Sequence, residues 1–179
     1  MANTTVACHL SITPYTASLE EYLTAHPHLA GLIVSAVIPH ADRILIIQRA
    51  AHDGFPLKWE IPGGGVDSTD ANILQAVHRE VFEETGLMVS EVLGVAETLE
   101  FDGSNARRWR KITFLVSVGS HGSGEVIPRV NLDAEEHVDW AWVTEREVLA
   151  GRAEGKQIDF AYDTQRQLLL DAFSKLRAR

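Results

Sequence analysis

The sequence WEIPGGGVDSTDANILQAVHREVFEETGL, residues 59–87, joins a short apolar run, a glycine turn and a segment rich in carboxylates. Residues 59–61 are predicted to form a strand that Pro62 ends, because proline cannot donate to a strand ladder. Residues 67–70 are all of types that cap helix N-termini, and Gly86 stands where a helix-ending glycine belongs. The stretch therefore predicts a strand, a turn and a helix of about four turns.

The predicted helix carries three carboxylates on one edge. At ~100° per residue, Glu83 and Glu84 lie about 60° and 40° to either side of Glu80. Like charges this close repel each other, and a bound cation removes that cost. Clustered oxygen ligands suit Mg²⁺ or Mn²⁺, and Arg79 is within reach of Glu83 to hold its carboxylate in place. The bare backbone of residues 63–65 can approach the same edge, where a carbonyl could be a further ligand.

The rest of the chain mixes strand and helix patterns. Ser18 and Glu21 have capping-box spacing, which predicts a short helix over residues 18–26. Residues 32–39 and 43–49 are β-branched runs separated by a polar turn, which favours a hairpin. Further predicted elements are strands at 91–101, 111–118 and 138–143, a helix at 144–151 and an amphipathic helix at 162–177. Strands outnumber helices, so the sequence predicts an α/β sandwich built on a mixed sheet.

The second half of the quoted stretch resembles the signature of the Nudix hydrolase family. That signature is a glycine, five residues, an acid, seven residues and then Arg-Glu-aliphatic-any-Glu-Glu-any-Gly-aliphatic. The final part is matched by Arg79, Glu80, Val81, Glu83, Glu84, Gly86 and Leu87. The strand order over residues 32–149 also fits the family fold, an α/β/α sandwich with a mixed β-sheet. The resemblance implies a single Nudix domain over residues 1–179, with an N-terminal arm and helix before this core and the helix at 162–177 after it.

The first acid of the signature departs from the pattern. Counting back from Arg79, the expected position falls on Ala71, whereas counting forward from Gly64 lands on Asp70. We interpret this as a one-residue insertion before the helix, with Asp70, or otherwise Asp67, standing in for the usual glutamate. Whether Asp70 binds a metal stays open.

The resemblance implies a hydrolase that cleaves a diphosphate linked to another group, X. In this family, metal ions held by the acids bind the diphosphate oxygens and activate a water that attacks phosphorus. By similarity, Glu80, Glu83 and Glu84 are ligands of Mg²⁺ or Mn²⁺. Arg79 supports them, and the Gly63 carbonyl is a candidate backbone ligand.

The resemblance also implies a general base, which several family members place on a loop just before a strand. Here that loop supplies Glu135 and Glu136. We favour Glu136, since residues closer to a strand are better fixed. The alternative is that both acids only solvate the loop.

Four residues are candidates for binding X: Arg49, Phe55, Arg108 and Trp109. Phe55 lies in a predicted loop at 50–58, while Arg108 and Trp109 lie in a polar loop at 102–110. An aromatic ring can stack on a base, and an arginine can receive a phosphate. The alternatives are a plain ion pair for Arg49 and a solvated hairpin loop for Arg108 and Trp109. The sequence does not identify X: a nucleoside diphosphate derivative is the default, and a prenyl or other organic diphosphate stays open.

Composition limits the partners. The formal net charge of −9 argues against broad nucleic-acid binding, which needs a basic face. No apolar run approaches the roughly 20 residues of a membrane span, and the first residues lack the pattern of a signal peptide. Cys8 is the one cysteine and cannot form an internal disulfide. We therefore expect a cytoplasmic protein that binds a small-molecule diphosphate and no membrane; a homodimer stays open.

Two other functions are alternatives to the metal-dependent hydrolase. One is a non-catalytic Nudix-like binding module, but such modules often lose acids of the signature that are intact here. The other is an isomerase resembling the isopentenyl-diphosphate isomerases, which need a cysteine inside the site. Cys8 lies far upstream of the signature and is a poor candidate for that role.

Overall fold

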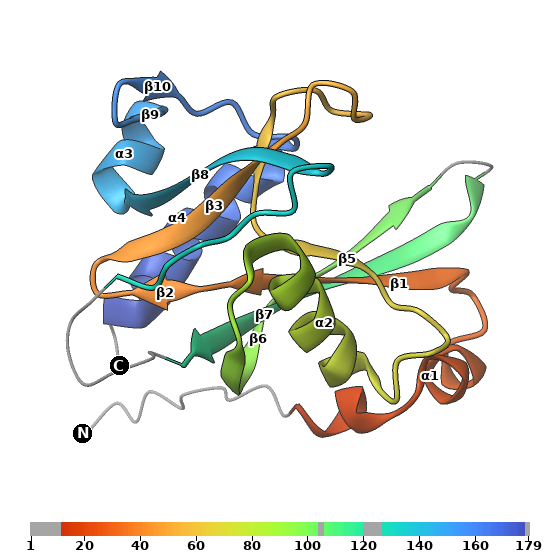
Figure 1. The fold of residues 1–179 in the computed structure, drawn as a ribbon. Coiled ribbons are helices and arrows are strands. Elements are labelled where there is room, and N and C mark those ends of the chain that lie inside the picture. The colour runs from red at the N-terminus through yellow and green to blue at the C-terminus, as the bar shows by residue number, and fades with distance from the viewer. Residues whose placement is uncertain (1–11, 104–105, 120–126, 178–179) are drawn as a thin grey trace, which may run out of the picture.

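The computed structural model describes residues 12–103, 106–119 and 127–177 as an α/β/α sandwich in which two sheets lie between helices (Figure 1). The helices are η1 (Thr13–Thr16), α1 (Leu19–Ala25), α2 (Ile73–Thr85), α3 (Glu145–Ala150) and α4 (Asp163–Arg177). The first sheet has the order β5 (Gly63–Gly65), β1 (Gly31–Val37), β7 (Arg108–Val118) and β6 (Val89–Asp102). The second contains β2 (Pro39–His40), β3 (Arg43–Arg49) and β4 (Trp59–Glu60), with β8 (His137–Thr144) beside β3. A small ribbon of β9 (Arg152–Ala153) and β10 (Lys156–Gln157) leads toward α4.

The first sheet is mixed, as the sequence predicts. Strand β1 runs parallel to β7, with Val34 opposite Ile112, and antiparallel to β5. Strands β6 and β7 form a long antiparallel pair. The antiparallel contact with β1 places the glycine turn at one edge of this sheet.

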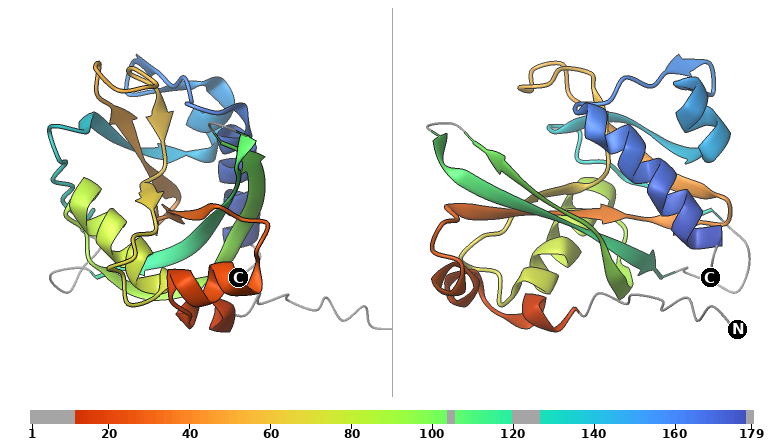
Figure 2. Two further views of the ribbon diagram at one scale, coloured as in Figure 1. Left: turned by 90° about the vertical axis from the view of Figure 1, so that its right-hand side faces the viewer. Right: turned by 180° about the vertical axis from the view of Figure 1, so that it is seen from behind.

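Two apolar cores fill the sandwich on its two sides. One packs α1 and α2 against the first sheet and includes Val34, Val77 and Phe114. The other packs α3 and α4 against the opposite side and includes Ile46 and Leu169. Figure 1 has α2 in front of the strands, and the view from behind in Figure 2 brings α4 to the front.

The predicted hairpin of residues 32–39 and 43–49 is wrong for most of its length. Strand β1 belongs to the first sheet, and only the two-residue β2 pairs with β3, with Pro39 opposite Ile44. Both runs are buried on both faces, so they lack the polar alternation that would indicate which strands they pair with. Proximity in sequence therefore predicted the strand pairing correctly only for the residues next to the turn.

Two further boundaries differ from the prediction. Helix α2 does not begin at residues 67–70: its N-cap is Asn72, whose side chain accepts a hydrogen bond from the Gln75 N–H. The predicted polar loop at 102–110 is shorter, because β7 already begins at Arg108. Trp109 pairs with Gly31 in the sheet, and a Cβ at Gly31 would lie 2.4 Å from its ring. Trp109 therefore packs on a neighbouring strand instead of standing in a loop.

Several local predictions are confirmed. The capping box of Ser18 and Glu21 begins α1, and that of Thr144 and Glu147 begins α3. Gly86 ends α2 with φ of 67°, in the left-handed region that favours glycine. No helix in the described part of the chain has the length and apolar character that crossing a membrane requires. Cys8 and the predicted N-terminal arm at residues 1–11 lie outside the described residues, and the single domain over 1–179 stays a prediction.

Candidate active site

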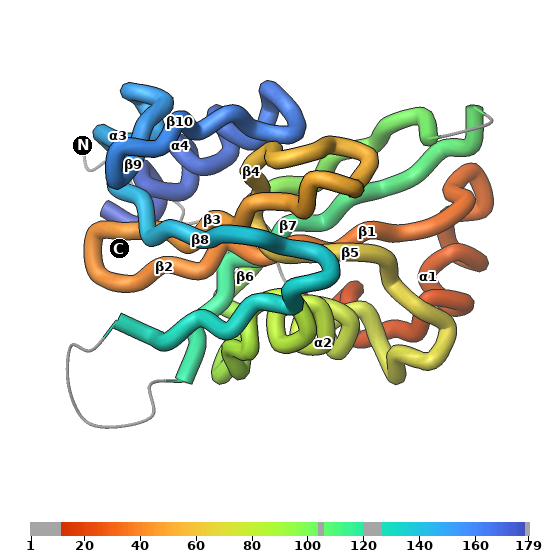
Figure 3. Tube along the Cα trace, turned by 45° about the horizontal axis from the view of Figure 1, so that its top comes forward, coloured from red at the N-terminus to blue at the C-terminus, as the bar shows by residue number. Residues whose placement is uncertain are grey.

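A pocket of about 860 Å³ opens beside the carboxylate edge of α2. Segments from distant parts of the chain meet around it: the glycine turn, the loop after β3, strands β6 and β7, the segment before β8, and the first turns of α4. Figure 3 shows the segment before β8 running along α2, where the Asn131 N–H donates to the Thr85 carbonyl at 2.8 Å. The acids that line the pocket are Asp53, Glu60, Glu80, Glu84, Glu97, Asp102, Glu135 and Glu136.

Glu84 lies deepest among the predicted metal ligands, with 5% of its surface exposed. Its carboxylate accepts a hydrogen bond from the Gly63 N–H at 2.7 Å. Burial raises the pKa of Glu84 well above its usual value, the Gly63 N–H opposes that shift, and the charges of Glu60, Glu80 and Glu136 add to it. The ionised acid is therefore unfavourable in the folded protein unless a cation lies beside it.

Glu80 lies one turn before Glu84 and faces the same pocket. Burial raises its pKa, which the ion pair with Arg79 partly reverses. The glycine turn makes room for this carboxylate: a Cβ at Gly64 would lie 2.5 Å from a Glu80 oxygen. Gly63 has φ of 152°, and a Cβ there would lie 2.2 Å from the Val34 carbonyl. The glycines are thus required for the close approach of turn and helix.

Arg79 joins the acids of the helix to the turn before it. Its guanidinium donates two hydrogen bonds to Asp70, both at 2.9 Å, and one to the Gly65 carbonyl. It also pairs with Glu80 at 2.7 Å and with Glu83 at 2.9 Å. The Glu83 side chain is 55% exposed and does not line the pocket.

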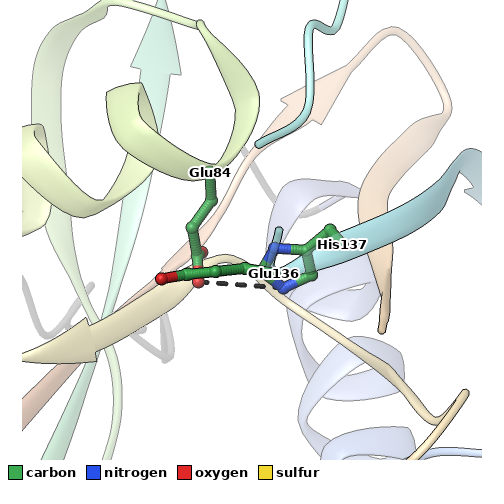
Figure 4. A group of neighbouring side chains, drawn as sticks. All are labelled: Glu84, Glu136 and His137. Carbon is green, nitrogen blue, oxygen red and sulfur yellow. Dashed lines mark ion pairs between the residues drawn. The ribbon is translucent and has the colours of Figure 1, made fainter. Parts of the chain in front are cut away.

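Three side chains of types that can bind a metal ion lie together in the pocket. One oxygen or nitrogen from each of Glu84, Glu136 and His137 lies within 4.8 Å of the others (Figure 4). The His137 Nε2 atom is 3.8 Å from Glu84 and 3.4 Å from Glu60. The sequence analysis missed Glu60 and His137. Their short-range pattern gives no signal, since each is brought to the site by strand pairing with β3.

Besides two histidines, the described lining of the pocket has two basic residues, Arg49 and Lys111. Arg49 is already engaged, because it pairs with Asp53 at 2.6 Å and with Glu60 at 2.5 Å. The hydrogen bonds from Arg49 lower the pKa of Asp53 to about 2. Lys111 makes no ion pair with the described residues, and burial lowers its pKa. An anionic ligand in the pocket would therefore meet one cation that is not already neutralised.

The predicted residues for binding X differ in their position relative to the pocket. Arg49 lines the pocket, whereas Arg108 and Trp109 do not. Arg108 instead pairs with Glu100 and Asp102, each at 3.2 Å. Phe55 is 40% exposed and packs against Tyr162 of the pocket wall, with ring centroids 5.0 Å apart. The sequence analysis missed Tyr162 and Gln165 as lining residues.

Comparisons with known proteins bear on the family of this fold. Residues 30–163 match the family model of the NUDIX domain. The chain belongs to the Nudix family. An RNA pyrophosphohydrolase of Caulobacter vibrioides is 30% identical over 124 residues, which cover 61% of this chain and 69% of that protein. A NUDIX hydrolase from Nitrosomonas europaea has a TM-score of 0.61 at 26% identity, over 81% of this chain and 89% of that chain.

The fold likeness extends over nearly the whole sequence. The NUDIX domain of Shewanella oneidensis NrtR, solved with ADP ribose, has a TM-score of 0.61 at 19% identity. That alignment covers 98% of this Nudix chain and 99% of the other. The relatives named as hydrolases, together with the match to the family model, identify the chain as an enzyme of the Nudix hydrolase family.

Asp70, the displaced first acid of the Nudix signature, is tied to Arg79 and to the Asp67 N–H, and does not line the pocket. We therefore expect Asp70→Ala to lower kcat by less than about tenfold, a smaller effect than the loss of a metal ligand. Steady-state kinetics at saturating metal measures this. A loss as large as that of a ligand substitution at Glu84 would make Asp70 a ligand and contradict the assignment.

Proposed function

We propose that this Nudix enzyme hydrolyses the diphosphate linkage of a nucleoside diphosphate derivative or a related organic diphosphate, using Mg²⁺ or Mn²⁺. One observation carries the proposal: Glu80, Glu84 and Glu136 line a single pocket together with Lys111, a basic residue that forms no ion pair with the described part of the chain. A diphosphate is repelled by such an acidic pocket unless metal ions lie between them. The pocket volume of about 860 Å³ suits a ligand of nucleotide size.

The residues present fit a divalent metal. Burial raises the pKa of Glu84, so a cation beside it would favour its ionised form, and carboxylate oxygens are the ligands that Mg²⁺ and Mn²⁺ prefer. We assign Glu80 and Glu84 as ligands, with the Gly63 carbonyl as a backbone ligand. Glu83, which does not line the pocket, would join them only by leaving its ion pair with Arg79. The metal, when bound, would polarise the phosphoryl oxygens and lower the pKa of a bound water. Arg79 supports Glu80 and Glu83 through its ion pairs.

Glu136 is the proposed general base. Its carboxylate lies in the group with Glu84 and His137, and its charge contributes to the raised pKa values of Glu80 and Glu84. Its backbone carbonyl accepts the Ala50 N–H at 2.8 Å, which fixes the residue against the strand next to it. A carboxylate oxygen of Glu136 would accept the proton of the attacking water. Glu135 also lines the pocket, but no such coupling to Glu80 or Glu84 supports it.

The substrate's phosphates are proposed to contact Lys111, because it is the cation that the pocket's acids leave unpaired. The group X would lie against Tyr162 and its ring partner Phe55. Arg49 is proposed to bind the substrate only if it first breaks its ion pairs with Asp53 and Glu60. A direct role for Arg108 and Trp109 has less support, since neither lines the pocket.

The proposal is tested with a panel of diphosphates, including nucleoside diphosphate sugars, dinucleoside polyphosphates, a 5′-triphosphate RNA and a prenyl diphosphate. Each is incubated with Mg²⁺, Mn²⁺ or EDTA. We expect the enzyme to hydrolyse at least one of these compounds at a diphosphate bond, and we expect EDTA to abolish the activity. Binding of a nucleotide without turnover of any panel member would instead favour a non-catalytic module.

Divalent metal is expected to stabilise the folded protein, because it relieves the repulsion among Glu80, Glu84 and Glu136. The stabilisation is RT ln(1 + [L]/Kd), about 2.7 kcal/mol at a hundredfold excess over Kd. Thermal unfolding in EDTA, Mg²⁺ and Mn²⁺ measures it, with Na⁺ at matched ionic strength as the control. Identical melting curves in all four solutions would contradict a metal site in the substrate-free enzyme.

A further inference from the structure

One polar side chain of the pocket wall has no partner. Gln165, in the first turns of α4, is 3% exposed, and neither its Nε2 nor its Oε1 atom has a hydrogen-bond partner among the described residues. It lines the pocket together with Thr164 and Leu168 of the same helix. A buried amide without hydrogen bonds destabilises a protein, and an apolar side chain of the same size would not. Packing alone therefore does not account for a glutamine at this position.

The start of α4 is fixed relative to the acids of the site. The Trp59 N–H donates to the Asp159 carbonyl at 2.8 Å, and the Ala161 N–H donates to the Trp59 carbonyl at 2.9 Å. These bonds attach the chain just before α4 to β4, and the next residue of β4, Glu60, lines the pocket. Gln165 is thus held by the same strand that supplies one of the pocket's acids.

The immediate surroundings of Gln165 suit a flat ring. Tyr162 lies one turn earlier on the pocket wall and packs against Phe55, while Leu168 follows one turn later. Aromatic and aliphatic surfaces of this kind stack on nucleobases. An amide beside them offers one donor and one acceptor in a plane, the pattern that complements the edge of a base.

We propose that Gln165 is a specificity-determining residue that reads the base of a nucleoside diphosphate substrate. Its Nε2 would donate to an acceptor on the base edge, and its Oε1 would accept from the neighbouring donor. Both amide atoms are buried, so base contact would require a rotation about the side-chain torsions that turns the amide toward the pocket. The assignment rests on the proposed hydrolase function and narrows X to a nucleoside, in preference to a prenyl chain or a sugar alone.

The test compares Gln165→Met with Gln167→Met. Methionine matches glutamine in length and removes both polar atoms. Gln167 is an exposed residue of the same helix whose side chain bonds only to Asp171, so it provides the matched control. For the best nucleoside substrate of the panel, Gln165→Met is expected to raise KM tenfold or more, with kcat within about twofold of wild type. The inhibition constant of inorganic diphosphate, which has no base, is expected to stay unchanged, and Gln167→Met should alter neither quantity.

A substrate analogue separates recognition from a structural role. An analogue whose base edge lacks the donor should lose about tenfold in kcat/KM with wild-type enzyme and nothing further with Gln165→Met. Gln165→Asn keeps the amide but shortens the side chain, and it should also raise KM. It provides a second test if the methionine variant does not fold.

Three results would overturn the assignment. Unchanged KM values in Gln165→Met, with active wild-type enzyme, would leave the hydrolase function standing and reject the role of Gln165. Turnover of base-free diphosphates alone would reject it in the same way. A wild-type enzyme that hydrolyses no diphosphate of the panel would reject the proposed function, and the base-reading role with it.

Discussion

Replacing Glu84 with glutamine is expected to lower kcat by about a hundredfold or more while the protein stays folded. The amide keeps the shape of the carboxylate and can still accept the Gly63 N–H bond. It cannot supply the negative charge that a divalent metal needs from its ligands. The kinetic loss should therefore come with weaker metal binding, which calorimetric titration with Mn²⁺ measures directly.

The same substitution should change the pH dependence of stability. Burial raises the pKa of Glu84 in the folded protein, so the folded state holds its proton at pH values where the unfolded state has lost it. Wild-type stability in EDTA should consequently fall as the pH rises from the unfolded pKa, about 4.3, through the raised folded pKa. Glu84→Gln has no such proton to lose. Its stability in EDTA should exceed that of wild type at neutral pH and converge with it in acid.

The control for both effects is Glu91→Gln. Glu91 is an exposed residue of β6 that does not line the pocket. That variant should keep wild-type kcat, metal affinity and pH profile. If Glu84→Gln retained near wild-type kcat at saturating metal, Glu84 would not be a ligand. If its stability in EDTA followed the wild-type pH profile, the burial of an ionised Glu84 would not be unfavourable.

The parts of the site that lie within one stretch of chain could be predicted from the sequence. Helical periodicity puts Glu80 and Glu84 on one edge of α2, and both line the pocket. The glycine turn was expected to approach this edge, and it does so where the Gly63 N–H donates a hydrogen bond to Glu84. Local geometry is sufficient in these cases, because the residues are joined by a helix and a short turn.

The parts of the site that depend on strand pairing could not be predicted. His137 reaches Glu60 and Glu84 only because β8 and β4 pair with opposite edges of β3, and nothing in the local pattern of any strand specifies that order. Gln165 lies on a helix whose apolar periodicity was visible, yet its place in the pocket depends on the bridge from Phe160 to Trp59. The hairpin error has the same origin, since fully buried runs carry no information about their neighbours.

Removing Arg79 is expected to destabilise the protein strongly. Arg79→Met deletes two hydrogen bonds to Asp70 and the pairing with Glu80, and it leaves the Asp70 carboxylate, with a side chain only 4% exposed, without its cation. Breaking a buried pair in this way costs about 3 kcal/mol or more. In a chain of this size that corresponds to a fall in Tm of about 6–12 °C. Arg146→Met, at an exposed position of α3, is the matched control and should change Tm little.

The origin of that loss can be tested through Asp70. The hydrogen bonds from Arg79 lower the pKa of Asp70 in the folded protein, so this pair stabilises wild type above the unfolded pKa of the acid and ceases to do so as the pH falls. The difference in stability between wild type and Arg79→Met should therefore shrink toward acid. The double variant Arg79→Met with Asp70→Asn no longer carries the unpaired charge at Asp70 and should recover part of the lost stability, a coupling that chemical denaturation measures. Equal stabilities of the single and double variants would show that the uncompensated Asp70 charge is not the cause, and the loss would then belong to the contacts of Arg79 with Gly65 and the α2 acids.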